Sequence, residues 1–202
     1  MAGNEFSKRK LHSLLGVIPV GLFLTQHLIV NSFAKRGAES FEAAAHFMEA
    51  LPARIFLEIF VIALPLLFHA IYGVYIAFTA KNNVNRFGTF RNWMFVLQRF
   101  TGIVTFVFVV WHVWETRLQV ALGNDTVDFN MMADILSNPW MMAFYIVGVV
   151  SAIFHFANGL WTFCISWGIT VSAKSQRINT YVTMAIFLIL SYVGVTALLA
   201  FV

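Results

Sequence analysis

Four histidines lie in long stretches of the chain that are nearly free of charged residues: His27, His69, His112 and His155. An ionisable group in hydrocarbon is costly, so such a residue usually has a function or a partner that satisfies it. The four are 42, 43 and 43 residues apart. One histidine of this kind could simply bridge two helices as a neutral imidazole. Four at a regular spacing favour a shared chemical role.

The elements that must position these histidines follow from composition. Of 202 residues, 60% are hydrophobic and only 11% are charged, which is too few to cover a water-soluble globule. Most of the surface must therefore face lipid, and nucleic acid is not an expected partner. The single cysteine, Cys164, excludes an intrachain disulfide and a cysteine-ligated iron–sulfur cluster. The uncharged runs predict an all-α, single-domain membrane protein (1–202) with transmembrane helices at about 11–33, 55–80, 93–116, 139–168 and 178–201.

The distribution of basic residues predicts the orientation in the membrane. With the N-terminus inside, the outer segments carry only four bases, and the positive-inside rule is satisfied. Two outer connections remain, in which 39–51 should form a short amphipathic helix. We expect His46, on that helix, to be solvated and His12, near the inner boundary, to be interfacial. The nine inner bases are Lys8, Arg9, Lys10, Lys81, Arg86, Arg91, Arg99, Lys174 and Arg177.

Helix depth sorts the four histidines into two pairs. Successive helices are antiparallel, so His27 and His112 should lie roughly 6–9 Å below the outer boundary at a rise of about 1.5 Å per residue. On the same basis His69 and His155 should lie roughly 21–24 Å below it. Each pair comes from two helices that are not neighbours in sequence. This is expected for diagonal partners in a four-helix bundle, formed by helices 1 to 4, that holds a cofactor.

Two opposed imidazoles in a dry bundle interior are suitable axial ligands for haem iron. A zinc site needs three or four ligands close together, and a proton relay needs acidic residues among the histidines. No Asp or Glu lies in the middle of a span. The sequence therefore predicts two haem groups, each held by one histidine pair.

Small and basic residues extend the predicted haem sites. His69 and His155 share the pattern Phe-His-x-x-x-Gly-x-aromatic, in which Gly73 and Gly159 lie one helical turn from the histidine. Missing side chains there could leave room for a flat macrocycle, although glycine also simply permits close helix packing. Gly16 and Gly102 could flank the inner haem from helices 1 and 3. Arg99 is the candidate partner for haem propionates, with snorkelling to the interface as the alternative. His12, near the inner boundary, could assist there, although we favour an interfacial residue.

A site for a membrane quinone needs polar groups beside an apolar entrance. Such groups occur near the His27/His112 layer, where Glu115 or His46 could exchange quinone protons. An ordinary boundary charge explains Glu115 equally well. The candidate quinone residues are Gln26, Asn31, Trp114 and Glu115, with Arg117 nearby.

Several longer segments carry a family resemblance. They are 9–20 (RKLHSLLGVIPV), 26–28 (QHL), 72–83 (YGVYIAFTAKNN), 111–117 (WHVWETR) and 154–161 (FHFANGLW). With them, the whole chain resembles the dihaem cytochrome b membrane-anchor subunits of succinate:menaquinone oxidoreductase from Bacillus-type Gram-positive bacteria.

The resemblance implies two b haems, a flavoprotein and an iron–sulfur subunit on the cytoplasmic face, and menaquinone as electron acceptor. It assigns His69 and His155 to an inner, higher-potential haem and His27 and His112 to an outer, lower-potential one. The oxidation of succinate is a step of the tricarboxylic acid cycle. Its electrons would pass through both haems to a quinone near the outer surface. The chain itself would hold no catalytic residue for succinate. Two alternatives are a dihaem cytochrome b of another quinone-linked enzyme, such as a hydrogenase or formate dehydrogenase, and a non-redox membrane protein with helix-bridging histidines.

Overall fold

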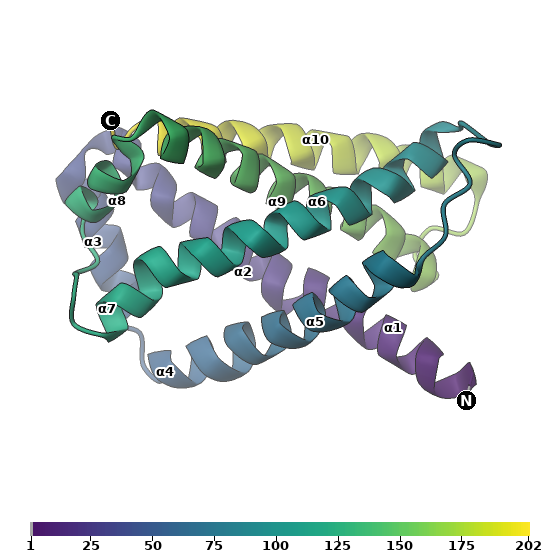
Figure 1. The fold of residues 1–202 in the computed structure, drawn as a ribbon, viewed down its shortest axis with the longest axis horizontal. Coiled ribbons are helices and arrows are strands. Elements are labelled where there is room, and N and C mark those ends of the chain that lie inside the picture. Colours follow the sequence, from purple (N-terminus) through teal and green to yellow (C-terminus); the bar gives the residue numbers. More distant parts are fainter. Residues whose placement is uncertain (1) are drawn as a thin grey trace.

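A computed structural model describes residues 2–202, which form helices and connecting loops without a β-strand. Five helical segments of the described chain are long and apolar enough to cross a membrane. They run alongside one another, and the two chain ends lie at opposite ends of the molecule (Figure 1). An odd number of crossings requires this arrangement. The five spans are Asn4–Arg36, Arg54–Thr79, Phe90–Ala121, Pro139–Ser166 and Ala173–Leu198.

The first span is interrupted once. Helix α1 (Ala2–Val17) gives way to α2 (Pro19–Asn31) because Pro19 has no N–H with which to continue the hydrogen-bond ladder. A 3₁₀ turn, η1 (Ser32–Arg36), follows. The span begins well before residue 11, where hydropathy alone placed it. Glu5 lies in the first turn, where a negative charge is favourable, and Lys8 and Arg9 point into solvent without interrupting the helix.

The second and third spans each contain a π-helical segment at the same end of the molecule. In the second span a short helix, α4 (Arg54–Phe56), and π-helix η2 (Leu57–Ala63) lead into α5 (Leu64–Thr79). Pro65, at the start of α5, cannot donate to a carbonyl in the preceding turn. The third span is α6 (Phe90–Val113), η3 (Trp114–Leu118) and α7 (Gln119–Ala121).

Side-chain caps determine where the last two spans begin. Helix α9 (Pro139–Ser166) starts at Asn138, whose side chain accepts from Trp140 N and Met141 N. Helix α10 (Ala173–Leu198) starts with a capping box between Ser172 and Ser175. This is about five residues before the predicted start at 178. The capping box satisfies backbone N–H groups of the first turn, so the helix can begin in a polar, basic segment.

Four helices close a ring around the site. Helix α1 contacts α5 and α9, while α6 contacts the same two helices from the other side. Helix α10 lies outside this ring, against α9 and α2. The ring brings the histidine-bearing faces of four spans toward a common interior.

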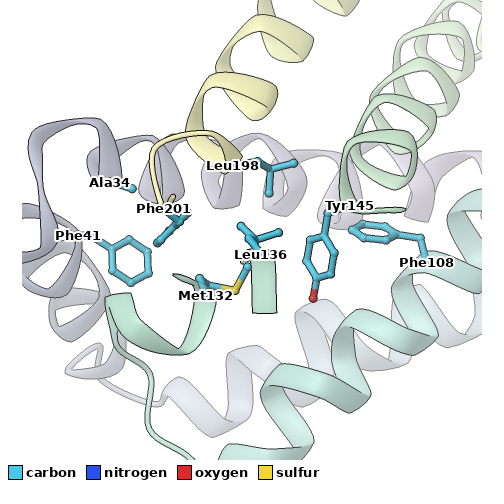
Figure 2. Packing of buried hydrophobic residues seen from close by; sticks show 8 residues of the cluster. All are labelled: Ala34, Phe41, Phe108, Met132, Leu136, Tyr145, Leu198 and Phe201. Atoms are coloured by element: carbon cyan, nitrogen blue, oxygen red, sulfur yellow. The ribbon is translucent and has the colours of Figure 1, made fainter. Parts of the chain in front are cut away.

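Two short helices close the end of the molecule that carries the C-terminus. They are α3 (Ala38–Glu49), close to the predicted 39–51, and α8 (Phe129–Leu136). Beneath them a buried apolar cluster joins η1, both short helices, α6, α9 and the C-terminal tail (Figure 2). We call this end the cap end, and the opposite one, with the start of α1, residues 81–91 and Ser172–Arg177, the basic end. The cap cluster is Ala34, Phe41, Phe108, Met132, Leu136, Tyr145, Leu198 and Phe201.

Candidate functional site

The four intramembrane histidines meet as two opposed pairs. The His27 and His112 ring centroids are 5.9 Å apart with the planes at 70°. The His69 and His155 centroids are 6.0 Å apart at 84°. These are the two combinations expected from helix depth. The first pair lies toward the cap end, where Phe108 and Tyr145 of the cap cluster contact His112.

Backbone carbonyls orient the His69/His155 pair. His69 Nδ1 lies 2.9 Å from the carbonyl oxygen of His12, and His155 Nδ1 lies 3.0 Å from that of Gln98. A carbonyl can only accept, so each Nδ1 carries the hydrogen and donates it. Each Nε2 is then left with a free lone pair, the form in which imidazole binds a metal ion. The Gln98 side chain is itself held by Asn158, whose Nδ2 donates to Gln98 Oε1 at 2.7 Å.

Side chains, by contrast, surround the His27/His112 pair. His112 Nδ1 lies 3.4 Å from the hydroxyl of Tyr145, which donates to Glu115 Oε2 at 2.9 Å. Because the Tyr145 hydrogen goes to Glu115, its oxygen is free to accept from His112. On the other side, Asn31 Nδ2 lies 3.4 Å from His27 Nε2 and donates to the His27 carbonyl at 2.9 Å. Two sets of polar contacts therefore reach this pair from the cap end, one through Tyr145 and Glu115 and one through Asn31.

Glycines allow the helices to approach the histidine rings. A Cβ added at Gly16 would lie 2.3 Å from His69 Cε1, and one at Gly102 would lie 2.9 Å from His155 Cε1. Both are closer than real side-chain contacts allow. Gly73 and Gly159 are the glycines of the sequence pattern. A Cβ added at Gly73 would lie 3.1 Å from His12 Nε2, and one added at Gly159 would lie 3.4 Å from Gln98 Nε2. They make room for the residues whose carbonyls orient the pair.

His12 lies inside the site, which corrects the expectation of an interfacial residue. Its ring stacks on His69 with centroids 4.0 Å apart and planes at 6°. His12 Nε2 is buried and has no hydrogen-bond partner among the described residues. The edge of Tyr72 approaches the ring, and the Tyr72 hydroxyl donates to Glu5 Oε2 at 3.0 Å. The kinked first span thus brings two histidines, His12 and His27, into the interior. Hydropathy alone could not show that helix 1 extends inward past residue 11.

Arg99 does not touch either pair through a direct hydrogen bond in the described chain. Its guanidinium lies over the ring of Phe95, 3.2 Å from the centroid, and Nη1 donates to the Phe95 carbonyl at 2.7 Å. Arg99 Nε is nevertheless buried without a partner among the described residues. Together with His12 Nε2, it is a buried nitrogen that an additional polar or anionic group could satisfy.

The candidate quinone residues have separate environments. Asn31 contacts His27, and Glu115 reaches His112 through Tyr145, as described above. Gln26 instead turns toward α3, with Nε2 3.3 Å from Met48 Sδ. Trp114 is exposed. Outside this set, Arg117 donates to Glu58 Oε2 at 2.7 Å, and His46 is solvated, as expected, beside Glu49.

The donor set fits a haem. Two imidazoles per site are too few for a metal ion held by protein alone, and the described residues contain no cluster of three or more such ligands. A macrocycle supplies the equatorial ligands itself and needs only axial ones. Opposed imidazoles, glycines at the rings, and the buried nitrogens of His12 and Arg99 form a surrounding suited to a flat group with acidic substituents.

Two residues of the site were not found by sequence reasoning. Tyr145 lies six residues into its helix, at a depth similar to that of His112, and Gln98 is an uncharged polar residue within a span. Depth matching, applied to all polar residues of the spans and not only to histidines, would have found Tyr145. Gln98 acts through its carbonyl, which any residue has, and through its side-chain amide, which donates to the His155 carbonyl at 3.0 Å. Only the side chain could have been found from the sequence.

The sequence is similar to known proteins of one family. Residues 81–194 match the family model described as the succinate dehydrogenase/fumarate reductase transmembrane subunit. Over 203 aligned positions, covering all of both chains, the sequence is 66% identical to the succinate dehydrogenase cytochrome b558 subunit of Bacillus subtilis (strain 168).

Proposed function

Because the chain belongs to the succinate dehydrogenase/fumarate reductase transmembrane subunit family, we propose that it passes electrons through two b haems to menaquinone. It is a cytochrome b subunit that anchors the enzyme in the bacterial cell membrane, which it crosses several times. The observation that carries the proposal is the presence of two opposed histidine pairs, each built from separate spans. A flavoprotein subunit and an iron–sulfur subunit would complete the enzyme.

In this proposal each histidine pair would hold one haem through its imidazole nitrogens. His69 and His155 hold the inner group, and His27 and His112 the outer one. When bound, haem b supplies a one-electron carrier in an interior from which water is excluded. The chain contributes ligand orientation through the carbonyls of residues 12 and 98, and space through its glycines. Gly73, Gly159 and Arg99 belong to the inner site, with Arg99 Nε as a donor to a propionate.

The basic end would face the cytoplasm and receive the iron–sulfur subunit. Eight of the 13 basic residues lie in the segments of this end, and Arg99 lies further along α6, which supports this orientation by the positive-inside rule. Succinate chemistry would take place entirely in the flavoprotein. Electrons would enter at the inner pair, which is nearer the basic end, and leave from the outer pair.

The quinone would be reduced at the cap end, beside His27 and His112. Glu115 is the best-supported proton-exchanging group because it accepts hydrogen bonds from both Tyr145 and Trp111 and connects to His112 through the phenol. Asn31 is the second polar group at this pair. Gln26 and Trp114 remain members of the proposed site, although Gln26 turns toward α3.

The first experiment is a dithionite-reduced minus oxidised absorption spectrum of the purified complex, with haem quantified against protein. Two b haems per chain are expected. One haem would mean that one histidine pair has another role. No haem, in folded protein from cells with ample haem, would refute the electron-carrier function.

Individual ligand variants test the pairing. His27→Ala and His112→Ala should lose the same haem, and His69→Ala and His155→Ala the other, as followed by redox titration. His46→Ala is the matched control, because that exposed histidine should leave both haems in place. Any other grouping of the four variants would contradict the proposed pairs.

A further inference from the structure

A pocket of about 390 Å³ opens at the basic end, away from the histidine pairs. It lies where the start of α6, the end of α9 and the start of α10 come together. The wall combines cationic, hydroxyl and aromatic side chains and contains no acidic residue. Its lining is Arg91, Trp161, Ala173, Gln176, Arg177, Thr180 and Tyr181.

Two arginines make the pocket electropositive. The Arg91 guanidinium lies over the Trp161 ring, 3.5 Å from the centroid, and donates to Thr180 Oγ1. Stacking and this hydrogen bond fix Arg91 in place while leaving other N–H groups of the fork unused. Arg177 is exposed, and every ion pair formed by Lys or Arg in the described chain involves Arg54 or Arg117 at the cap end. Both pocket arginines therefore lack a carboxylate partner there.

An apolar groove continues from the pocket toward the middle of the span. A cavity of about 30 Å³ shares Arg91 and Thr180 with the first one and is otherwise mainly apolar. It is too small to enclose an acyl chain, which would lie along its exposed rim. The side chains at its outer rim, Phe90 and Met184, are exposed on the surface of the span. The remaining lining residues are Met94, Phe154, Ala157, Asn158, Thr183 and Phe187.

We propose that this combined site binds one phospholipid with an anionic headgroup. The headgroup phosphate would accept from Arg91 and Arg177, with Thr180 and Tyr181 as hydroxyl partners, and an acyl chain would follow the apolar groove. Free phosphate would use the arginines but not the groove. A neutral quinone would use the groove but not the two charges. Only an anionic amphiphile matches both parts.

The test uses the intact complex reconstituted into nanodiscs of phosphatidylglycerol or phosphatidylcholine and then released for native mass spectrometry. Phosphatidylglycerol should be retained and phosphatidylcholine should not. The double substitution Arg91→Gln/Arg177→Gln should weaken retention roughly 30-fold, as expected from about fivefold per basic residue near an anionic lipid. Lys81→Gln/Arg86→Gln removes the same charge from the same end without lining the pocket, and should retain the lipid.

Two further variants separate binding from folding. Arg177→Gln removes a side chain that carries no packing role and should give a partial loss. Arg91→Lys keeps the charge without the planar fork and should weaken retention less than Arg91→Gln. Three results would overturn the proposal: equal retention of both lipids, displacement of the lipid by millimolar inorganic phosphate, or retention by the isolated chain but not by the complex. The last would mean that a partner subunit covers the pocket.

Discussion

At the scale of single residues, Tyr145 has a role that can be separated from haem binding. Its hydroxyl accepts from His112 Nδ1, which makes that imidazole a more basic ligand and favours ferric iron. Tyr145→Phe should therefore raise the midpoint potential of the outer haem. The rise should be at most about 40 mV, which corresponds to one hydrogen bond of about 1 kcal/mol in a one-electron couple. Potentiometric titration followed by absorption spectroscopy measures it.

A matched control exists at the other end of the molecule. Tyr72 also donates to a glutamate, Glu5, but contacts neither outer histidine. Tyr72→Phe should leave the outer haem potential unchanged. If both variants moved the outer potential equally, the effect would come from general loosening of the helices rather than from the contact with His112.

The residue scale also shows which parts of the site the sequence could predict. The histidine pairs follow from spacing alone, because antiparallel helices of similar length place every second histidine at one depth. Side-chain type identified Asn31 and Glu115 as polar neighbours. It could not identify the carbonyls of His12 and Gln98 as orienting groups, since main-chain atoms leave no mark in the sequence.

At the scale of helices, different glycines allow the helix backbone to approach each histidine pair, so the two haem sites should respond to different substitutions. Gly16→Ala and Gly102→Ala should weaken or abolish binding of the inner haem, because the new Cβ would collide with His69 or His155. Overpacking of this kind costs about 1–3 kcal/mol. The outer haem should remain. Haem-specific features of the reduced spectrum separate the two.

Two other glycines provide the controls. Gly148→Ala would place a Cβ 2.2 Å from the Phe108 ring, which stacks on His112, so it should affect the outer haem instead. Gly88→Ala meets only a carbonyl oxygen at 3.7 Å and should leave both haems intact. Loss of the same haem in Gly16→Ala and Gly148→Ala would argue against two independent sites.

Helix number was predictable and helix ends were not. Five runs of apolar residues give five spans because a bilayer requires that length from each crossing. The starts at Ala2 and Ala173 lie in charged or polar segments that hydropathy assigns to loops. Exposed Lys8 and Arg9 side chains allow the first helix to include its charged segment, and the Ser172–Ser175 capping box starts the last helix. An average of hydropathy over a span removes both local effects.

At the scale of the whole molecule, charge is strongly divided between the ends. The ion pairs that link Arg54 and Arg117 to Glu49 and Glu58 lie at the cap end, where the acids are concentrated. At the basic end the one acid, Glu5, accepts from Tyr72. The cap end, with eight acids against four bases, is thus net negative, and the basic end keeps its positive charge for the membrane surface and for partner subunits.

This asymmetry gives a direct test of orientation. In a Cys164→Ser background, Asp125→Cys should react with a membrane-impermeant maleimide in cells with an intact membrane. Asn83→Cys should react only after permeabilisation, because it would face the cytoplasm. The reverse pattern would contradict the N-terminus-inside topology, and labelling of both sites after detergent treatment controls for reactivity.

The two histidine pairs also differ in how readily a mutation can change the contacts that orient them. The carbonyls that orient His69 and His155 persist whatever side chains occupy positions 12 and 98. A single codon change at Tyr145 or Asn31 removes a contact to the outer pair. The hydrogen bonds that orient the inner pair therefore survive side-chain substitution at positions 12 and 98, whereas the contacts of the outer pair depend on which side chains are present. Over evolutionary time, or in a directed-evolution experiment, adaptation to a new quinone would accumulate at the cap end while the inner ligand geometry is inherited unchanged.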